Sequence, residues 1–423
     1  MLFDPPESWR KVQLEEVCDR ITVGHVGSMA DKYVDDGIPF LRSQNITPFK
    51  IDLGSVKYIG EEFNSKLKKS ALRPGDVAVV RTGYPGTAAV IPPSLPISNC
   101  ADLVVITPSE DLDPWFLSCL FNSIWGKGAV AGNLVGVAQQ HFNVSAAKNL
   151  TIYLLPLVTQ RRIAAALSAY DDLIENNTRR IEILEEMARR LYEEWFVHFR
   201  FPGNEGVSFK ESELGKIPEG WRIQELGDVY QINPEAIKPK SAPDEIHYID
   251  IASVSPGQID KAETMQFANA PGRARRIVRS GDVLWSCVRP NRRSCAMVVE
   301  PRENTVASTG FAVLRARSVS KHYLYQHVRA DQFVSYLVNR ATGAAYPAVK
   351  AADFKEAKII VPQRDILSDF DKAVAPMRSL IHRLDRKNAN LRAQRDLLLP
   401  KLVSGEIDVS DIPMPNDKEV EAA

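Results

Sequence analysis

The feature that most constrains the fold of this sequence is an internal duplication. Glu-Ser-Trp-Arg at 7–10 returns as Glu-Gly-Trp-Arg at 219–222, which is 212 residues later. Three further segments recur in the same order. Residues 38–46 are repeated at 246–254 with an offset of 208, residues 72–77 at 278–283 with an offset of 206, and Leu155-Pro156 as Val361-Pro362, again with an offset of 206. Four matches at a nearly constant offset predict two copies of one fold, each ending in a strand followed by proline.

Length and composition agree with a globular chain of more than one unit. A chain of 423 residues exceeds what one hydrophobic core usually organises, and its 44% hydrophobic and 25% charged residues exclude wholesale disorder. Lys+Arg and Asp+Glu both number 53, which excludes a uniformly basic coat but not a local basic face. There is no run of 18 apolar residues, and five cysteines without a C-x-x-C pair indicate reduced thiols. We therefore expect a cytoplasmic protein.

Each strand-proline step is followed by a long charged segment with apolar residues at heptad spacing. The proposed seam residues are Ile174, Asn177, Ile181, Leu184 and Leu191 in the first segment, and Ile381, Leu384, Asn388, Leu391 and Leu398 in the second, 207 residues later. Helices of roughly 40 residues are about 60 Å long, too long for one small domain to cover. The spacing favours antiparallel pairing of the two helices, with the asparagines fixing the register. The alternative is two separate surface helices, and Pro400 should end or kink the second one.

The globular halves combine strand and helix signals, so we predict a mixed α/β fold class: two duplicated α+β domains joined by two long antiparallel coiled-coil helices. Short strands are expected at 77–80, 103–106 and 283–285, and helices at 114–121 and 323–339. The predicted boundaries are 1–156 for the first domain, 157–200 for the central helix, 201–218 for a linker, 219–362 for the second domain, 363–407 for the C-terminal helix and 408–423 for a flexible tail.

The chain lacks the common signatures of catalysis. It has no G-x-x-x-x-G-K-[ST] loop, no G-x-G-x-x-G loop, no H-E-x-x-H helix and no G-x-S-x-G elbow. Its seven histidines lie far apart, with no metal-ligand spacing. We therefore predict no catalytic residues, no metal and no cofactor bound by this chain.

Positive charge is concentrated in one stretch of the second half. Residues 272–293 hold seven arginines and one acid, Asp282, which gives +6 in 22 residues. A solvated surface would explain such a run, but arginine can also bind phosphate or guanine bidentately. The DNA-contact candidates are Arg276, Arg289, Asn291, Arg292, Arg293, Tyr346 and Lys350 in the second half, and Arg42, Gln44, Asn45, Arg81, Tyr84, Gln139 and Gln140 in the first. The first-half clusters fit polar loops equally well. Arg81 and Arg289 each lie in the loop after the Gly-Asp-Val strand of their own half, which predicts that the two arginines occupy equivalent sites.

Four stretches carry a resemblance to a known family. Residues 191–199 (LYEEWFVHF), 215–221 (GKIPEGW) and 397–407 (LLLPKLVSGEI), together with the strand-proline step before each helix, resemble specificity subunits of type I restriction-modification enzymes. With the duplication, the likeness spans nearly the whole chain. It implies that the two globular halves are target-recognition domains, each reading half of a bipartite DNA site. Recognition domains diverge strongly, so the resemblance does not identify their base-contact residues.

The resemblance also implies partners. The helix pair would act as a ruler and dock two methyltransferase (M) subunits, which carry S-adenosylmethionine, while restriction (R) subunits use ATP and magnesium. The chain itself would be non-catalytic. Alternatives are a helical adaptor without sequence-specific DNA reading and a fused methyltransferase-specificity chain, although the repeat leaves no room for a cofactor-binding domain in the latter. Apolar residues near Leu191 to Phe199 are expected to be exposed for docking.

Overall fold

The computed structural model describes residues 9–95, 97–134 and 141–410. The chain forms two compact units, residues 1–177 with 387–423, and residues 178–386. Both boundaries fall inside long helices, α5 (Leu157–Tyr192) and α10 (Arg364–Val403), so each unit contains one globular part and one segment of each helix. No helix in the described ranges is long and apolar enough to cross a membrane.

The first unit is built on two antiparallel-rich sheets. One has the order β10 (Ala88–Val90), β9 (Val77–Val80), β12 (Leu103–Pro108) and β2 (Cys18–Val23). The other has the order β3 (Tyr33–Val34), β7 (Lys57–Ile59), β4 (Ile38–Leu41), β11 (Ser98–Cys100) and β8 (Ala71–Leu72), in which β4 and β11 are parallel. Two pairs complete the unit, β1 (Arg10–Gln13) with β13 (Thr151–Leu154) and β5 (Ile46–Thr47) with β6 (Lys50–Ile51). Its short helices are α1 (Glu61–Lys66), α2 (Pro114–Asn122), α3 (Ile124–Gly132) and α4 (Val144–Lys148).

The second unit repeats this plan. One sheet has the order β24 (Cys295–Met297), β23 (Val283–Ser286), β26 (Phe311–Ala316) and β17 (Tyr230–Ile232). The other has the order β21 (Glu263–Gln266), β18 (Glu245–Ile249), β25 (Thr305–Ser308) and β22 (Ala274–Ile277). The β18–β25 pair is again parallel. The remaining pairs are β16 (Arg222–Glu225) with β27 (Lys358–Val361), β19 (Val254–Ser255) with β20 (Gln258–Ile259), and β14 (Phe209–Lys210) with β15 (Ile217–Pro218).

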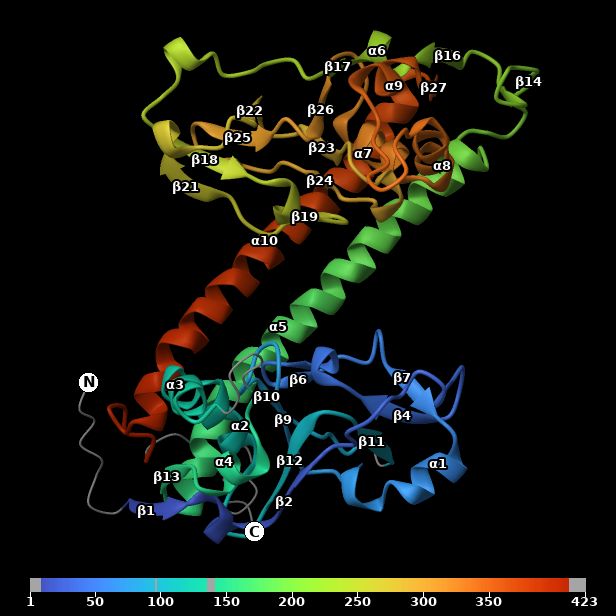
Figure 1. Cartoon of the computed structure of the whole chain (residues 1–423). Coiled ribbons are helices and arrows are strands. Elements are labelled where there is room, and N and C mark those ends of the chain that lie inside the picture. Colours follow the sequence, from blue (N-terminus) through green and yellow to red (C-terminus); the bar gives the residue numbers. More distant parts are fainter. Residues whose placement is uncertain (1–8, 96, 135–140, 411–423) are drawn as a thin grey trace, which may run out of the picture. The chain divides into compact units, whose positions relative to one another are not determined.

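Short helices cover one end of the second unit. They are α6 (Leu226–Val229), α7 (Lys321–Arg329), α8 (Asp331–Arg340) and α9 (Ala351–Glu356). Helices α7, α8 and α9 gather at one end of the unit, whereas β18, β21, β22 and β25 lie at the other (Figure 1). Apart from the additional edge strand β3 of the first unit, the strand orders of the two units match, so the duplication expected from the sequence is confirmed.

The repeated Gly-Asp-Val turn shows the duplication at the level of single hydrogen bonds. Gly75 and Gly281 have φ of +88° and +93°, which favours glycine. Asp76 and Asp282 are buried, and the Oδ2 of each accepts from the backbone N–H three residues earlier at 2.8 Å. An arginine neutralises each carboxylate, but from different strands. Arg20 of β2 serves the first unit and Arg315 of β26 the second.

The long helices run antiparallel within each unit. In the first unit, Asn177 Nδ2 donates to Asn388 Oδ1 at 2.9 Å, and the Arg395 guanidinium pairs with Asp171. In the second unit, the Arg378 guanidinium pairs with Glu185. There the rings of Trp195 and Phe196 also lie 5.9 Å and 4.9 Å from the ring of Phe370. The antiparallel pairing is therefore confirmed inside both units, and the alternative of two isolated surface helices is wrong.

The proposed seam is buried as expected at its centre. Asn177 and Asn388 are 4% and 2% exposed, so the pair that should fix the register is removed from water. The buried seam residues also include Ile381, Leu384 and Leu391, whereas Ile174, Ile181, Leu184, Leu191 and Leu398 are partly buried. Asn388 Nδ2 also lies 3.4 Å from the carbonyl oxygen of Ile174.

Several local predictions need correction. Helix α10 contains Pro376 in its interior, and it continues past Pro400 to Val403, so Pro400 does not end it. Proline removes only one backbone donor, and packing on both sides maintains the helix. The helix expected at 323–339 is two helices, α7 and α8, separated at Ala330. The other expected strands and the helix at 114–121 are confirmed as β9, β12, β23 and α2.

The segment 201–218, expected to be a linker, contributes to the core of the second unit. It carries the β14–β15 pair, and Phe201 stacks on the buried ring of Trp221 with centroids 5.2 Å apart. Phe201 and Ile217 are 6% and 1% exposed. This segment therefore anchors the end of α5 to the globular part of the same unit.

Candidate nucleic-acid interface

Two loops of the second unit meet beside the central sheet. One is the turn 287–294 between β23 and β24, and the other is 341–350, between α8 and α9. Val349 N–H donates to Cys287 O at 2.9 Å, and Arg289 N–H donates to Pro347 O at 2.7 Å. Val288 and Ala348 form a β-bridge. The loops are therefore one hydrogen-bonded surface rather than two independent segments.

Arg289 is bound to the neighbouring loop instead of projecting freely. Its backbone adopts φ of +51°, and its Nη2 donates to the carbonyl oxygen of Ala345 at 3.3 Å. The guanidinium carbon lies 4.8 Å from the ring centroid of Tyr346, a cation–π geometry. The Tyr346 side chain is 70% exposed. The two predicted DNA-contact residues are thus brought together, with the tyrosine outermost.

The neighbouring candidates remain accessible. Asn291, Arg292 and Lys350 are exposed, and the side chain of Arg292 makes no hydrogen bond or ion pair with another residue in the described ranges. Arg293 is exposed too, but its Nη2 lies 2.6 Å from Asp331 Oδ1. Arg292 is accordingly the best placed of these arginines to reach an external anion.

The rest of the arginine run is mainly structural. Arg273 pairs with Asp250 at 2.7 Å, Arg279 pairs with Glu235 at 2.8 Å, and Arg275 lies over the ring of Phe267 at 5.0 Å. Arg276, on β22, is partly buried, and its Nε has no hydrogen-bond partner. Internal carboxylates therefore already neutralise part of the charge of this run.

The first-unit candidates around the turn after β4 differ in accessibility. Gln44 is exposed, whereas Arg42 is half-buried, with its Nη2 donating to Ser55 O at 2.8 Å. Asn45 is fully buried, its Oδ1 accepts from Arg42 N–H, and its Nδ2 donates to Asp52 O. The amide of Asn45 holds the turn together and cannot face bases, which corrects the prediction for this residue.

Arg81 is likewise occupied within the first unit. Its side chain is 14% exposed, with Nη1 2.9 Å from Asp102 Oδ1 and Nε 3.2 Å from Phe142 O. Tyr84, three residues later, is 84% exposed. Gln139 and Gln140 lie outside the described residues.

The predicted equivalence of Arg81 and Arg289 is wrong by two positions. Phe142 N–H donates to Arg81 O, and Val349 N–H donates to Cys287 O, at offsets of 207 and 206 residues. Arg81 therefore corresponds to Cys287, and Arg289 corresponds to Gly83. Gly83 also has positive φ, +83° against +51° for Arg289. Counting four residues past the valine of each Gly-Asp-Val motif gives the same pair, Arg81 and Cys287, so the prediction placed the equivalent residue two positions too far along the chain.

A buried polar cluster links both long helices to α7 in the second unit. The Glu185 carboxylate accepts from Arg378 and from Arg329, and both guanidiniums lie over the Tyr325 ring, at 4.5 Å and 4.7 Å. Burial would raise the pKa of Glu185, but the two guanidiniums outweigh it and lower the pKa. Burial raises the pKa of Tyr325 to about 12. This cluster was not predicted from the sequence, although an arginine between Val374 and Ile381 at helical spacing was a usable signal.

The outward face of α5 also differs from the prediction. Within 191–199, Trp195 and Phe196 are buried in an aromatic cluster and Leu191 is partly buried, so most of this stretch is not a docking surface. The exposed apolar residues on this segment of α5 are instead Ile183 at 51% and Met187 at 47%, one helical turn apart.

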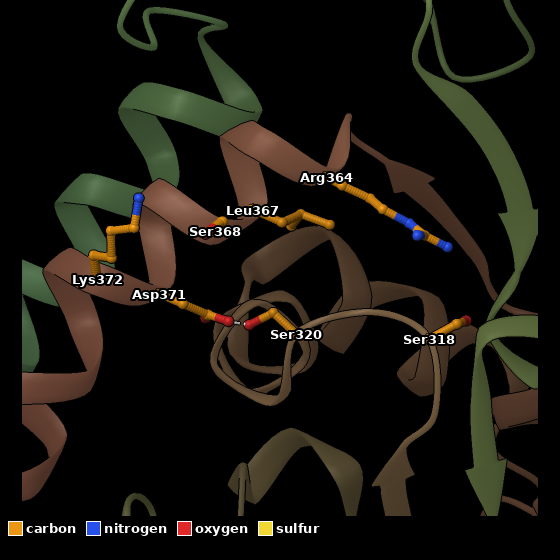
Figure 2. Close-up of a pocket in the computed structure, with 7 residues that line it drawn as sticks. All are labelled: Ser318, Ser320, Arg364, Leu367, Ser368, Asp371 and Lys372. Carbon is orange, nitrogen blue, oxygen red and sulfur yellow. Dashed lines mark hydrogen bonds between the residues drawn. The ribbon is translucent and has the colours of Figure 1, made fainter.

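A pocket of about 540 Å³ lies at the beginning of α10 in the second unit (Figure 2). It is lined by Ser318, Ser320, Arg364, Leu367, Ser368, Asp371 and Lys372. Ser320 Oγ donates to the Asp371 carboxylate, and burial raises the pKa of Asp371. Within the described ranges, no group of three or more His, Cys, Asp or Glu residues could hold a metal ion.

Comparisons with known proteins agree with this architecture. Residues 6–186 match the family model described as the type I restriction modification DNA specificity domain. The MjaIX specificity subunit of a type I restriction enzyme from Methanocaldococcus jannaschii is 25% identical over 60% of this chain and 60% of its own length. The HindI specificity subunit of Haemophilus influenzae is 23% identical over 59% of this chain and 67% of its own length. The chain thus spans about three fifths to two thirds of these relatives.

A solved structure extends the likeness to most of the chain. The crystal structure of a type I restriction-modification S subunit from M. genitalium aligns with 93% of this chain and 96% of its own, with a TM-score of 0.57 at 14% identity. At this identity the likeness concerns the fold, which has the same mixed α/β architecture. The first part of the chain therefore matches the type I restriction modification DNA specificity domain, and the chain is similar to curated type I specificity subunits and shares the fold of a solved S subunit.

Proposed function

We propose that this chain is the non-catalytic, DNA-reading subunit of a type I restriction-modification complex, and that each unit recognises one half of a bipartite duplex site. One observation carries the proposal. Apart from strand β3, both units contain the same arrangement of sheets. In both, the turn after β9 or β23 is hydrogen-bonded to a second loop, through Arg81 and Phe142 or through Cys287 and Val349. Two equivalent loop surfaces on one chain suit two half-sites.

The chemistry is proposed to reside in partner subunits. Methyltransferase subunits would supply S-adenosylmethionine and methylate adenine, and restriction subunits would use ATP and magnesium. No cofactor is assigned to this chain. The exposed pair Ile183 and Met187 on α5 is the proposed centre of the methyltransferase dock, because apolar side chains in water favour burial by a partner.

The test is a methylome comparison. Cells lacking restriction-modification genes would express the chain with its genomic methyltransferase subunits, each component alone, or neither. We expect methylated adenines at one bipartite sequence only when both components are present. Replacing residues 1–156 by the corresponding domain of a relative should change one half of that sequence and leave the other half unchanged.

Three outcomes would contradict the proposal. Methylation that does not depend on this chain would remove its role as the reader of sequence. Association of the purified chain with methyltransferase subunits, but no binding of the complex to duplex DNA, would support the helical adaptor instead. Methyl transfer by the isolated pure chain would refute its non-catalytic assignment.

A further inference from the structure

Each unit displays a tyrosine that its own packing does not require. Tyr84 and Tyr346 are 84% and 70% exposed, although a buried tyrosine ring normally contributes stability. They lie on different loops of the repeated pair, Tyr84 on the turn after β9 and Tyr346 on the loop before α9. Because these two loops are hydrogen-bonded to each other in both units, both tyrosines lie on the surface assigned to DNA.

The loop that carries Tyr346 is held in a defined conformation. Thr342 and Ala348 exchange both backbone hydrogen bonds, each 2.9 Å, and thereby close the loop at its base. Gly343 has φ of +105°, and a Cβ there would lie 3.0 Å from the carbonyl oxygen of Tyr346. The position thus requires glycine. Ordering the loop before binding reduces the entropy lost when its tip contacts a partner.

Arg289 contributes to that order from the other loop. Its backbone N–H donates to the carbonyl oxygen of Pro347, and its Nη2 donates to the carbonyl oxygen of Ala345. The face of its guanidinium lies over the ring of Tyr346. Its φ of +51° is a conformation that a non-glycine residue adopts at some energetic cost. The surrounding contacts compensate for this cost, so the arginine is built into the loop and is not a mobile surface cation.

The charge of the surface indicates the partner. Loops 287–294 and 341–350 contain Arg289, Arg292, Arg293 and Lys350 but no aspartate or glutamate. The ion pair with Asp331 neutralises Arg293, which leaves three cations on the two loops that carry the exposed ring, and Arg289 lies against that ring. A polyanion with aromatic bases and apolar sugar faces matches this combination of ring and cations.

We propose that Tyr346 places its ring against a base or deoxyribose of the second half-site, and that Arg289 is a positioning residue that holds this ring rather than a base reader. Arg292 contacts phosphate. Tyr84 has the corresponding role in the first unit. The proposal rests on the function proposed above and names the residues that carry it out in the second domain.

The experiment uses the chain in complex with its methyltransferase subunits. The probe is a fluorescent duplex carrying the sequence that the wild-type complex methylates, with binding measured by anisotropy at several salt concentrations. The variants are Tyr346→Ala, Tyr346→Phe, Arg289→Ala, the double variant Tyr346→Ala with Arg289→Ala, and Arg292→Ala. Val338→Ala is the matched control, because Val338 is an exposed apolar residue, 41%, on α8 of the same unit.

Loss of the ring should weaken binding roughly 5- to 150-fold, the range for one base–aromatic stack. The dependence on salt should stay unchanged, because no charge is removed. Tyr346→Phe and Val338→Ala should bind within about twofold of wild type. Arg292→Ala should instead reduce the slope of log K against log salt by about 0.9.

The double variant tests the role of Arg289. A positioning residue acts through the ring, so removing Arg289 as well as Tyr346 should weaken binding no further than removing Tyr346 alone. Genomic methylation by these variants should lose discrimination at the second half-site and retain it at the first. Thermal melting of each variant complex should match wild type, which excludes unfolding as the cause.

Three results would overturn the inference. Tyr346→Ala could bind and methylate like wild type, the losses from Tyr346→Ala and Arg289→Ala could multiply, or Tyr346→Ala could release the methyltransferase subunits. The second result would make Arg289 a DNA contact in its own right, and the third would make the ring a protein contact. Failure of the proposed function has a different signature, since the wild-type complex would then bind no specific duplex.

Discussion

Replacing Glu185 by alanine is expected to destabilise the second unit by about 3 kcal/mol. The side chains of Glu185 and Arg378 are 18% and 7% exposed, so the substitution leaves a buried guanidinium without its counter-ion. Breaking such a pair typically costs about 3–5 kcal/mol. Two features favour the lower end. Arg329 is 29% exposed and can be solvated, and the Tyr325 ring still attracts both guanidiniums, by about 0.5–2 kcal/mol each.

The assay is urea denaturation followed by tryptophan fluorescence, with Trp221 and Trp285 buried in the same unit. The matched control is Glu186→Ala, one residue along the same helix. Hydrogen bonds from Arg189 and Arg190 lower the pKa of Glu186 to about 2, but the side chain is 39% exposed and its ion pairs are screened by water. A loss below about 1 kcal/mol for Glu185→Ala, or a loss no larger than for Glu186→Ala, would refute the buried-charge argument.

Three further predictions concern single features of the structure. Asn177→Leu alone should destabilise the first unit by about 1–3 kcal/mol, because it leaves the amide of Asn388 without its side-chain partner. Replacing both Asn177 and Asn388 by leucine should recover most of that loss, as measured by urea denaturation. Burial lowers the pKa of His327 to about 4. The unfolded chain then binds more protons below pH 6.5, so stability should fall as pH drops from 6.5 to 4, by up to about 3 kcal/mol, and His327→Gln should flatten this slope. Gly75→Ala and Gly281→Ala should each cost roughly 1 kcal/mol or more in thermal melting because of their positive φ, and equal stability of either variant and wild type would contradict this reasoning.

Repetition and periodicity predicted the features that depend on long stretches of sequence. The heptad spacing that leads to Asn177 and Asn388 identified both long helices and their pairing, because many residues contribute to one helical face. The repeated Gly-Asp-Val motif located equivalent strands for a similar reason. The parallel pairing of β4 with β11 was not predictable, since it joins strands that are distant in the chain and have no local signal.

The surroundings of individual candidate residues were harder to predict, for a physical reason. Asn45 and Gln44 are adjacent polar residues, yet one amide stabilises a buried turn and the other faces water. Arginine is equally ambiguous, because a guanidinium suits an internal carboxylate as well as a phosphate. Arg81 and Arg292 therefore look alike in the sequence, and only the position of Asp102 in the fold distinguishes them.

The asparagine pair limits how genes for such a chain can recombine. The 207-residue offset relates Asn177 to Leu384 and Asn388 to Ile181, so the polar position differs between the two helices. A recombinant carrying two copies of the first helix would set each asparagine against an isoleucine and leave its amide buried without a partner. Exchange of the globular parts alone leaves the pair intact. Exchange between genes can therefore replace the globular parts, whereas a product with two copies of the first helix loses the hydrogen bond between Asn177 and Asn388.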